Sequence, residues 1–193
     1  MKRILFIALS VFSFIQGYSQ DNKSDIEAKN ESGTKTQTKV DIGYEGIALA
    51  YDVKVLPSTT MDLNVGIGGY YDISESNFDY YLNPTKPAVF VSINPKYFYN
   101  QRQRAENGKN TNLNSGNYIG IKAKYSSKST SSKVFSDEVL LYNIHWGVQR
   151  ALGRNTLWSA YAGVGYGDRV NSNVGTLYPV LGIKFSYLPF LAQ

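Results

Sequence analysis

His145 is the side chain in this sequence best suited to act as a general base near neutral pH, and it is the only histidine of the chain. It lies in an alternating segment, on the same face as Asn143 and Gln149. Those neighbours equally suit a histidine that only fills a polar interior, and we favour that second interpretation. The chain has no cysteine, which excludes a thiolate nucleophile and a thiolate metal site. We therefore predict no catalytic residue, no cofactor and no metal site.

Two glycine-rich segments, residues 66–69 and 163–167, could be mistaken for phosphate-binding loops. Neither has the G-x-G-x-x-G spacing with an acidic partner or opens a predicted helix. Their glycines fall on one face of alternating segments, where a tight barrel needs small residues, so we interpret them as structural. The basic residues are scattered and the net charge is only +5, so we expect no nucleic-acid partner.

The N-terminus has the composition of a secretory signal peptide. Lys2 and Arg3 precede a mostly apolar run over residues 4–15, and small residues follow at Gly17 and Ser19. The apolar run is shorter than the roughly 20 residues that span a bilayer, so an uncleaved anchor is the less favoured interpretation. The pattern predicts cleavage directly after Ser19.

Period-two alternation of apolar and polar residues recurs along the rest of the chain, which indicates half-buried strands. Each segment runs for about ten residues, as a tilted membrane strand requires. A closed barrel with both ends on one side needs an even number of strands, so we place a further strand within residues 34–44, followed by a tight turn at 45–46. The clear segments are residues 47–55, 61–71, 89–99, 119–126, 140–149, 158–167 and 176–187. The predicted fold is all-β, a closed antiparallel up-and-down transmembrane β-barrel of eight strands.

Alternation alone does not say which face meets water, because a soluble lipocalin-like barrel turns its apolar face inward. Here the polar face is rich in glycine and carries long lysines, which suits a narrow, wet lumen. With eight strands the interior is only just wide enough for its side chains, so an ionic plug is favoured over an open pore. The charged residues predicted to line the lumen are Asp52, Lys54, Asp62, Lys96, Lys122, Lys124 and Lys184.

Aromatic residues of the apolar face gather near the segment ends, as in the two aromatic girdles of a membrane barrel. We predict one girdle of Tyr51, Tyr97, Tyr99, Trp158 and Tyr187, and another of Tyr71, Tyr125, Tyr142 and Tyr166.

The connections predict which end of the barrel faces outward, because outer-membrane barrels have short periplasmic turns and longer extracellular loops. Residues 72–87 and 127–138 are long and polar, and we predict them as extracellular loops that could bind a surface ligand. The first of these contains Phe78, Tyr80 and Tyr81, and the alternative is that these aromatic residues rest on the barrel rim. The connection over residues 100–116 falls on the periplasmic side although it is long.

The last predicted strand carries the most specific motif. Gly182, Phe185 and Tyr187 fit the pattern G-x-x-aromatic-x-aromatic, although Val180 stands where a polar residue is usual. Together with the signal peptide and the short alternating strands, this motif resembles the small outer-membrane β-barrels, the outer-membrane-protein-A-like and porin-family barrel domains. The resemblance covers about residues 40–190. It implies the outer membrane of a Gram-negative bacterium, with the motif as the signal read by the barrel-insertion machinery.

On this basis we divide the chain into a signal peptide (1–19), a flexible periplasmic lead (20–39) and an outer-membrane β-barrel (40–193). We expect contact with outer-membrane lipid, including lipopolysaccharide, and with the barrel-assembly machinery, and a monomeric state.

We predict a non-enzymatic outer-membrane protein with a structural or surface-contact role carried by its extracellular loops. One alternative is a lipid A-modifying barrel enzyme, since deacylases of this kind resemble the chain in size and compartment. Those enzymes have a serine two residues after the histidine, whereas this chain has Gly147. The other alternative is a narrow small-solute channel, which would need a lumen free of lysine–acid pairs.

Overall fold

A computed structural model describes residues 33–131, 136–170, 172 and 174–189. These residues belong to one compact unit, residues 32–193. The predicted signal peptide and most of the predicted lead lie outside the described residues. Among the residues described, no helix is long and apolar enough to cross a membrane.

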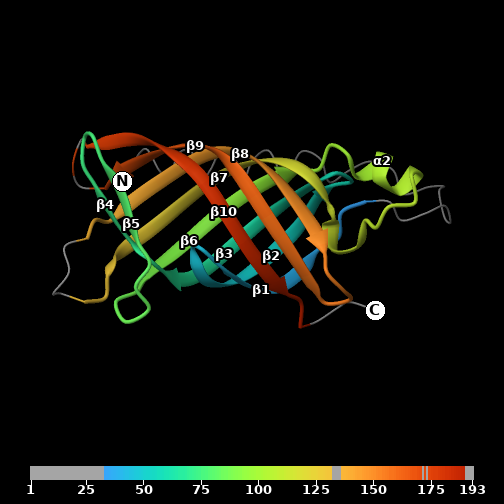
Figure 1. The fold of residues 1–193 in the computed structure, drawn as a ribbon, viewed down its shortest axis with the longest axis horizontal. Coiled ribbons are helices and arrows are strands. Elements are labelled where there is room, and N and C mark those ends of the chain that lie inside the picture. Colours follow the sequence, from blue (N-terminus) through green and yellow to red (C-terminus); the bar gives the residue numbers. More distant parts are fainter. Residues whose placement is uncertain (1–32, 132–135, 171, 173, 190–193) are drawn as a thin grey trace, which may run out of the picture. The chain divides into compact units, whose positions relative to one another are not determined.

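Eight antiparallel strands close into a barrel in the order β1-β10-β9-β8-β7-β6-β3-β2, which confirms the predicted strand number and closure (Figure 1). Each barrel strand pairs with the barrel strands before and after it in the chain, and β1 pairs with β10 to close the barrel. Strands β4 and β5 lie between β3 and β6 in the sequence and form a separate two-stranded sheet. The barrel strands are β1 (Gln37–Gly43), β2 (Gly46–Leu56), β3 (Thr59–Gly68), β6 (Ala88–Tyr97), β7 (Gly116–Ser129), β8 (Val139–Ala151), β9 (Thr156–Arg169) and β10 (Gly175–Tyr187).

The two faces of the barrel wall are the reverse of those in a soluble protein. Aliphatic and aromatic side chains such as Val65, Ile144 and Ile183 point outward and are about half exposed, while Asp62 and Ser159 point inward and are fully buried. The lipocalin-like alternative, with an apolar interior, is therefore wrong. The predicted assignment of faces is confirmed for the seven clear alternating segments, except at Tyr71, which is buried, and at Lys54, which is exposed.

The first strand predicted within residues 34–44 is confirmed, and it starts before the boundary at residue 40 that divides the predicted lead from the barrel. β1 starts at Gln37, so residues 37–39 are part of the barrel wall rather than the end of a flexible lead. Thr34 is also buried, and its hydroxyl donates to the carbonyl of Leu56 at 2.9 Å. The predicted tight turn is confirmed at Tyr44–Glu45, and it ends at Gly46, whose φ of 120° favours glycine.

At one end of the barrel, the predicted loop 72–87 is largely a hairpin, β4 (Tyr70–Ile73) and β5 (Phe78–Tyr81). The chain breaks from the barrel wall at Gly69, which turns Tyr71 inward, so its predicted place in a girdle is wrong. Tyr71 and Ile73 pack in an apolar cluster with Val139 and Leu141 of β8. The hairpin thereby covers this end of the lumen.

Phe78 and Tyr80 of β5 also pack onto the barrel, as the alternative interpretation proposed, whereas Tyr81 is exposed and stacks on Tyr70 of β4. The Phe78 ring stacks on Tyr178 of β10 at 4.0 Å between centroids. The Tyr80 hydroxyl donates to the Tyr44 carbonyl at 2.9 Å and accepts from the amide of Gly69. Burial is the main cause that raises the pKa of the Tyr80 hydroxyl above its ordinary value, so this group stays protonated and able to donate.

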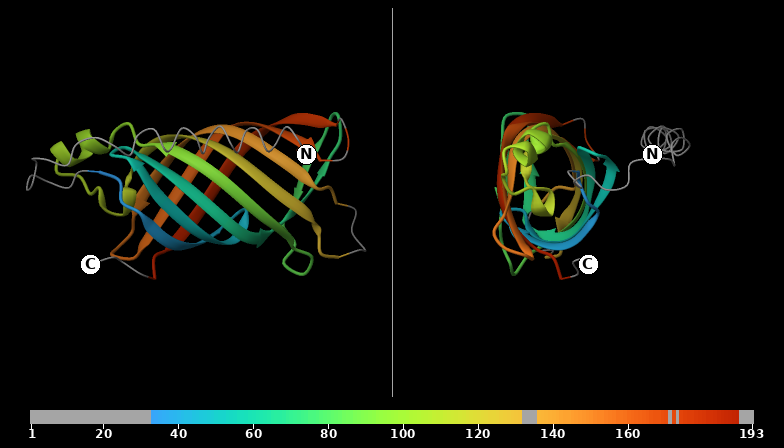
Figure 2. Two further views of the ribbon diagram at one scale, coloured as in Figure 1. Left: turned by 180° about the vertical axis from the view of Figure 1, so that it is seen from behind. Right: turned by 90° about the vertical axis from the view of Figure 1, so that its right-hand side faces the viewer.

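At the opposite end, the long connection 100–116 forms the short helix α2 (Gln101–Glu106) and the turn η1 (Asn112–Asn114), and it lies across the barrel opening (Figure 2). Gln149 of β8 donates from inside the barrel to the carbonyl oxygens of Leu113 and Asn114, at 3.0 and 3.3 Å. The Asn114 side chain in turn exchanges two hydrogen bonds with the backbone of Lys35. This connection, to which the sequence assigned no role, covers the second end of the lumen.

Candidate functional site

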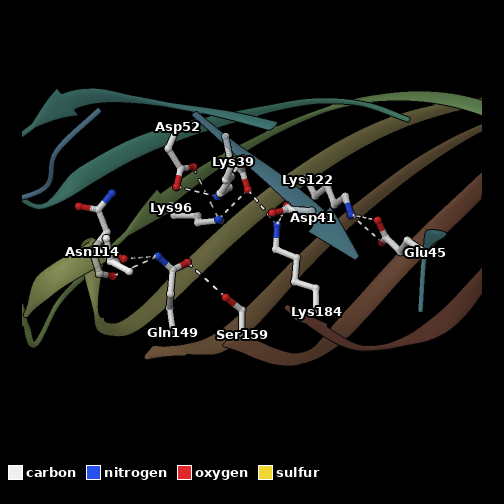
Figure 3. Close-up of polar contacts among 12 residues, drawn as sticks. Lys39, Asp41, Glu45, Asp52, Lys96, Asn114, Lys122, Gln149, Ser159 and Lys184 are labelled. Atoms are coloured by element: carbon white, nitrogen blue, oxygen red, sulfur yellow. Dashed lines mark hydrogen bonds and ion pairs between the residues drawn. The ribbon is translucent and has the colours of Figure 1, made fainter. Parts of the chain in front are cut away.

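The barrel interior is the strongest concentration of polar chemistry in the described chain, and its centre is Asp62 of β3. The Asp62 carboxylate is fully buried and lies 2.7 Å from the ammonium group of Lys96, 3.3 Å from that of Lys184 and 3.4 Å from that of Lys39. Lys39 also pairs with Asp52 at 2.7 Å (Figure 3). These groups come from β1, β2, β3, β6 and β10, so the cluster joins strands around much of the barrel.

Lys184 extends this cluster toward the turn between β1 and β2 by pairing with Asp41 of β1. A second cluster lies nearby around Glu45, the last residue of that turn. Its carboxylate is 2.5 Å from Lys122 and 3.6 Å from Lys124, and it accepts a hydrogen bond from Tyr161 at 3.0 Å. The Lys124 ammonium group also lies 4.2 Å from the centre of the Phe90 ring.

These ion pairs fill the lumen as the sequence predicted, but their membership differs. Lys54, predicted to line the lumen, is exposed because it stands close to the end of β2, where the register with β3 shifts. Lys39, Asp41 and Glu45 were not predicted. Lys39 and Asp41 alternate with the outward residues of β1, so the period-two pattern could have predicted that they face inward. Glu45 belongs to a turn, where no periodic pattern indicates the direction of a side chain.

The space left inside the barrel is small. A cavity of about 40 Å³ lies between the two ion clusters, with Asp41, Asn64, Asn94 and Tyr161 among its lining residues. One ordered water needs about 10–15 Å³, so the cavity has room for a few waters only. One carboxylate oxygen of Asp41 and the amide oxygen of Asn94 are buried without a protein partner, and waters in the cavity would satisfy them. Both ends of this interior are also covered, by the β4–β5 hairpin and by the 100–116 connection.

His145 points into this interior, as predicted, and is only 2% exposed. Its Nδ1 lies 2.8 Å from the side-chain oxygen of Asn143, and the rings of Tyr118 and Tyr161 flank it. Gly120 on β7 faces it so closely that a methyl group there would meet Nε2 at 2.5 Å. The histidine therefore occupies a packed site on the inner side of the wall, away from the outer surface of the barrel.

The predicted barrel-insertion motif has a structural role of its own. Phe185 and Tyr187 are half exposed on the outer face, whereas Gly182 faces inward under the ring of Tyr161. A Cβ at position 182 would lie 2.2 Å from that ring, so glycine is required for packing at this place.

The predicted aromatic girdles are largely on the outer face. Apart from Tyr71, all their members are exposed or half-buried there: Tyr51, Tyr97, Tyr99, Tyr125, Tyr142, Trp158, Tyr166 and Tyr187. The indole of Trp146 donates to the Tyr99 hydroxyl at 2.8 Å on this surface, which adds a second tryptophan to the aromatic set. That these rings mark two bilayer interfaces stays a prediction.

Within the described part of the chain, no group of three or more histidine, cysteine or acidic side chains could hold a metal ion. No family model matches the chain, and no curated protein or solved structure shows significant similarity to it.

Proposed function

We propose that this protein is a non-enzymatic outer-membrane β-barrel that stabilises the membrane and presents its outer end for surface contacts. The observation that carries the proposal is the reversal of faces: an apolar exterior surrounds an interior of buried ion pairs. A water-soluble monomer rarely exposes contiguous apolar surface on this scale, because such surface promotes association. A bilayer is the solvent in which this exterior is favourable.

The dimensions of the wall support the same proposal. A strand of ten residues, such as β3 or β6, rises by ~3.3 Å per residue, so at a tilt near 40° it spans about 25 Å along the barrel axis. That height equals the apolar band expected of a bacterial outer-membrane barrel. Closure of the barrel also satisfies most backbone hydrogen bonds within the wall, as hydrocarbon demands, although β1 pairs with β10 only from Lys184 to Tyr187.

The plugged interior favours a structural role over conduction. Lysine–carboxylate pairs cross the lumen, and each opening is covered, by the β4–β5 hairpin at one end and by the 100–116 connection at the other. The deacylase alternative has no supporting observation either, since His145 lies inside the wall and Gly147 takes the place of the serine. Tyr81 and Leu82, at the base of the hairpin where β5 ends, are exposed and give a partner at the outer end an apolar surface to contact.

Membrane fractionation and gel mobility test this proposal together. The full-length precursor would be expressed in a Gram-negative host, and its outer membranes would be separated from inner membranes and soluble protein. We expect the protein in the outer-membrane fraction, migrating faster on detergent gels when unheated than when boiled, because a closed barrel resists detergent. Recovery as a soluble monomer, or identical migration with and without boiling, would reject the proposal.

A further inference from the structure

The charges outside the lumen are divided unequally between the two ends of the barrel. The end covered by the 100–116 connection carries seven basic side chains and one acidic side chain, in residues 33–36, 54–58, 98–118 and 149–155. The end covered by the β4–β5 hairpin carries three basic and six acidic ones, in the described residues 69–87, 127–131, 136–139 and 168–170. An anionic partner is therefore attracted to the first end and repelled by the second.

Arg150 of β8 brings part of this positive charge onto the outer face of the wall. It follows the inward-facing Gln149 and pairs directly with Trp158 of β9, so its side chain points away from the lumen. Trp158 belongs to the predicted girdle at this end, and Tyr99 of the same girdle is near enough to act on the charge of Arg150. The guanidinium therefore lies at the level where the headgroups of a surrounding membrane would be met.

Arg104 of α2 lies near Arg150 because Asn100 anchors the segments that carry them. The amide of Arg104 donates to the Asn100 carbonyl at 3.0 Å, and the amide of Asn117 on β7 donates to the Asn100 side chain at 2.7 Å. The side-chain oxygen of Asn117 in turn accepts a hydrogen bond from Arg150 at 2.6 Å. The guanidinium groups of Arg104 and Arg150 are close enough for their charges to repel each other.

This arginine pair has no acidic partner within the described part of the chain, whereas Arg102 of the same helix pairs with Glu106 at 2.9 Å. Arg150 and Arg104 each donate to one backbone carbonyl as well, at 2.8 and 2.9 Å. A guanidinium has five N–H donors, so further donors of each group remain for a ligand. An anion that accepts from both groups would relieve their repulsion, and the oxygens of a phosphate match the planar guanidinium well.

We propose that Arg104 and Arg150 bind the phosphate of an anionic phospholipid in the inner leaflet, an inference that rests on the proposed membrane location. The acyl chains would lie on the apolar wall beside Arg150, along the outward side chains of Val148 and Trp146. A zwitterionic phospholipid also carries an ammonium group, which this basic end repels, so it should bind more weakly. An acidic polymer beneath the membrane would approach the end of the barrel, whereas Arg150 points sideways from the wall. The expected contact with lipopolysaccharide concerns the other leaflet and the other, acidic end.

Native mass spectrometry of the mature protein, extracted from outer membranes in mild detergent, tests the inference. The barrel is titrated with phosphatidylglycerol or with phosphatidylethanolamine of the same acyl chains, and we expect the first to bind about tenfold more tightly. Arg150→Gln and Arg104→Gln should each lower the affinity for phosphatidylglycerol about tenfold, because hydrogen bonds to a charged group are lost. Arg104 stands on α2, outside the barrel wall, so its variant keeps the barrel folded even if Arg150→Gln does not.

The matched control is Arg102→Gln, which lowers the charge of the same end equally but removes a guanidinium that already has a carboxylate partner. Loss of the lipid preference in Arg104→Gln but not in Arg102→Gln supports the inference. Equal affinity for both lipids, an equal loss in all three variants, or binding of isolated peptidoglycan through these arginines in place of lipid overturns it.

Gel mobility of the same samples separates this inference from the proposed function. A heat-modifiable barrel in the outer membrane that does not prefer phosphatidylglycerol overturns the inference while leaving the proposed function intact. Failure to find the barrel in the membrane rejects the proposed function itself, and the inference with it.

Discussion

Replacing Asp62 by asparagine removes the one carboxylate that three lysines share. The ammonium groups of Lys96, Lys184 and Lys39 lie 2.7, 3.3 and 3.4 Å from it. At an effective dielectric constant of ~20, Coulomb's law gives about 5 kcal/mol for one such pair at 3 Å, part of which desolvation offsets. Breaking a buried pair by removing one partner typically costs about 3–5 kcal/mol, because the other charge is left uncompensated. We expect Asp62→Asn to lower the free energy of unfolding by that amount.

The assay is urea unfolding of the barrel folded in lipid vesicles, followed by tryptophan fluorescence and by the fraction that keeps its fast gel mobility. Glu106→Gln is the control, since Glu106 makes an exposed pair with Arg102 one helical turn away on α2. That substitution should cost about 0.3–0.5 kcal/mol. Adding Lys96→Met to Asp62→Asn should recover part of the loss, because it removes the lysine whose remaining carboxylate contact, with Asp52 at 3.9 Å, is the longest. If Asp62→Asn unfolds within about 1 kcal/mol of wild type, the lumen charges do not stabilise the barrel as argued.

Further predictions concern the outer face, the histidine and the N-terminus. Val65→Arg should lower the free energy of unfolding in vesicles by about 2–4 kcal/mol if this outward side chain meets the bilayer midplane. The control Leu56→Arg, at the end of β2, should lower it by about 0–1 kcal/mol. Equal losses in the two variants would mean that the wall is not placed in a bilayer as proposed. His145→Asn should leave the lipid A mass profile of expressing cells unchanged; acyl loss that requires the wild-type histidine would move the protein to the hydrolases. Mass spectrometry of the mature protein should give an N-terminus at Gln20, directly after Ser19, and an intact first residue would refute signal-peptide cleavage.

The sequence was informative where one periodicity governed a whole segment. Period-two alternation placed Val65 and Ile183 outside and Asp62 inside, because in a strand the side of each residue follows from its parity. It failed at Tyr71, where the break at Gly69 ends the strand and resets that parity. A backbone break of this kind depends on where the next strand can pair, which local alternation does not contain.

Long-range contacts account for the rest of what was missed. Lys39 was assigned to a flexible lead because its surroundings are polar, yet it is buried by ion pairs with Asp52 and Asp62 on other strands. Glu45 enters the lumen from a turn, and its partners Lys122 and Lys124 are far away along the chain. The fold of the 100–116 connection across the barrel end depends equally on distant hydrogen bonds, from Gln149 and to the backbone of Lys35.

The ion cluster around Asp62 has a consequence for how the barrel forms. Lys39 belongs to the first strand of the barrel and Lys184 to the last, yet both contact the same carboxylate of β3. A sheet that has not yet closed would hold Asp62 without its full set of counter-charges, and its inner face would meet hydrocarbon with ionised groups exposed. If the barrel folds in a bilayer as proposed, intermediates with an open seam are disfavoured, and closure between β1 and β10 is expected to be an all-or-none step. The three lysines and three aspartates of this cluster therefore come together only when the barrel is completely closed.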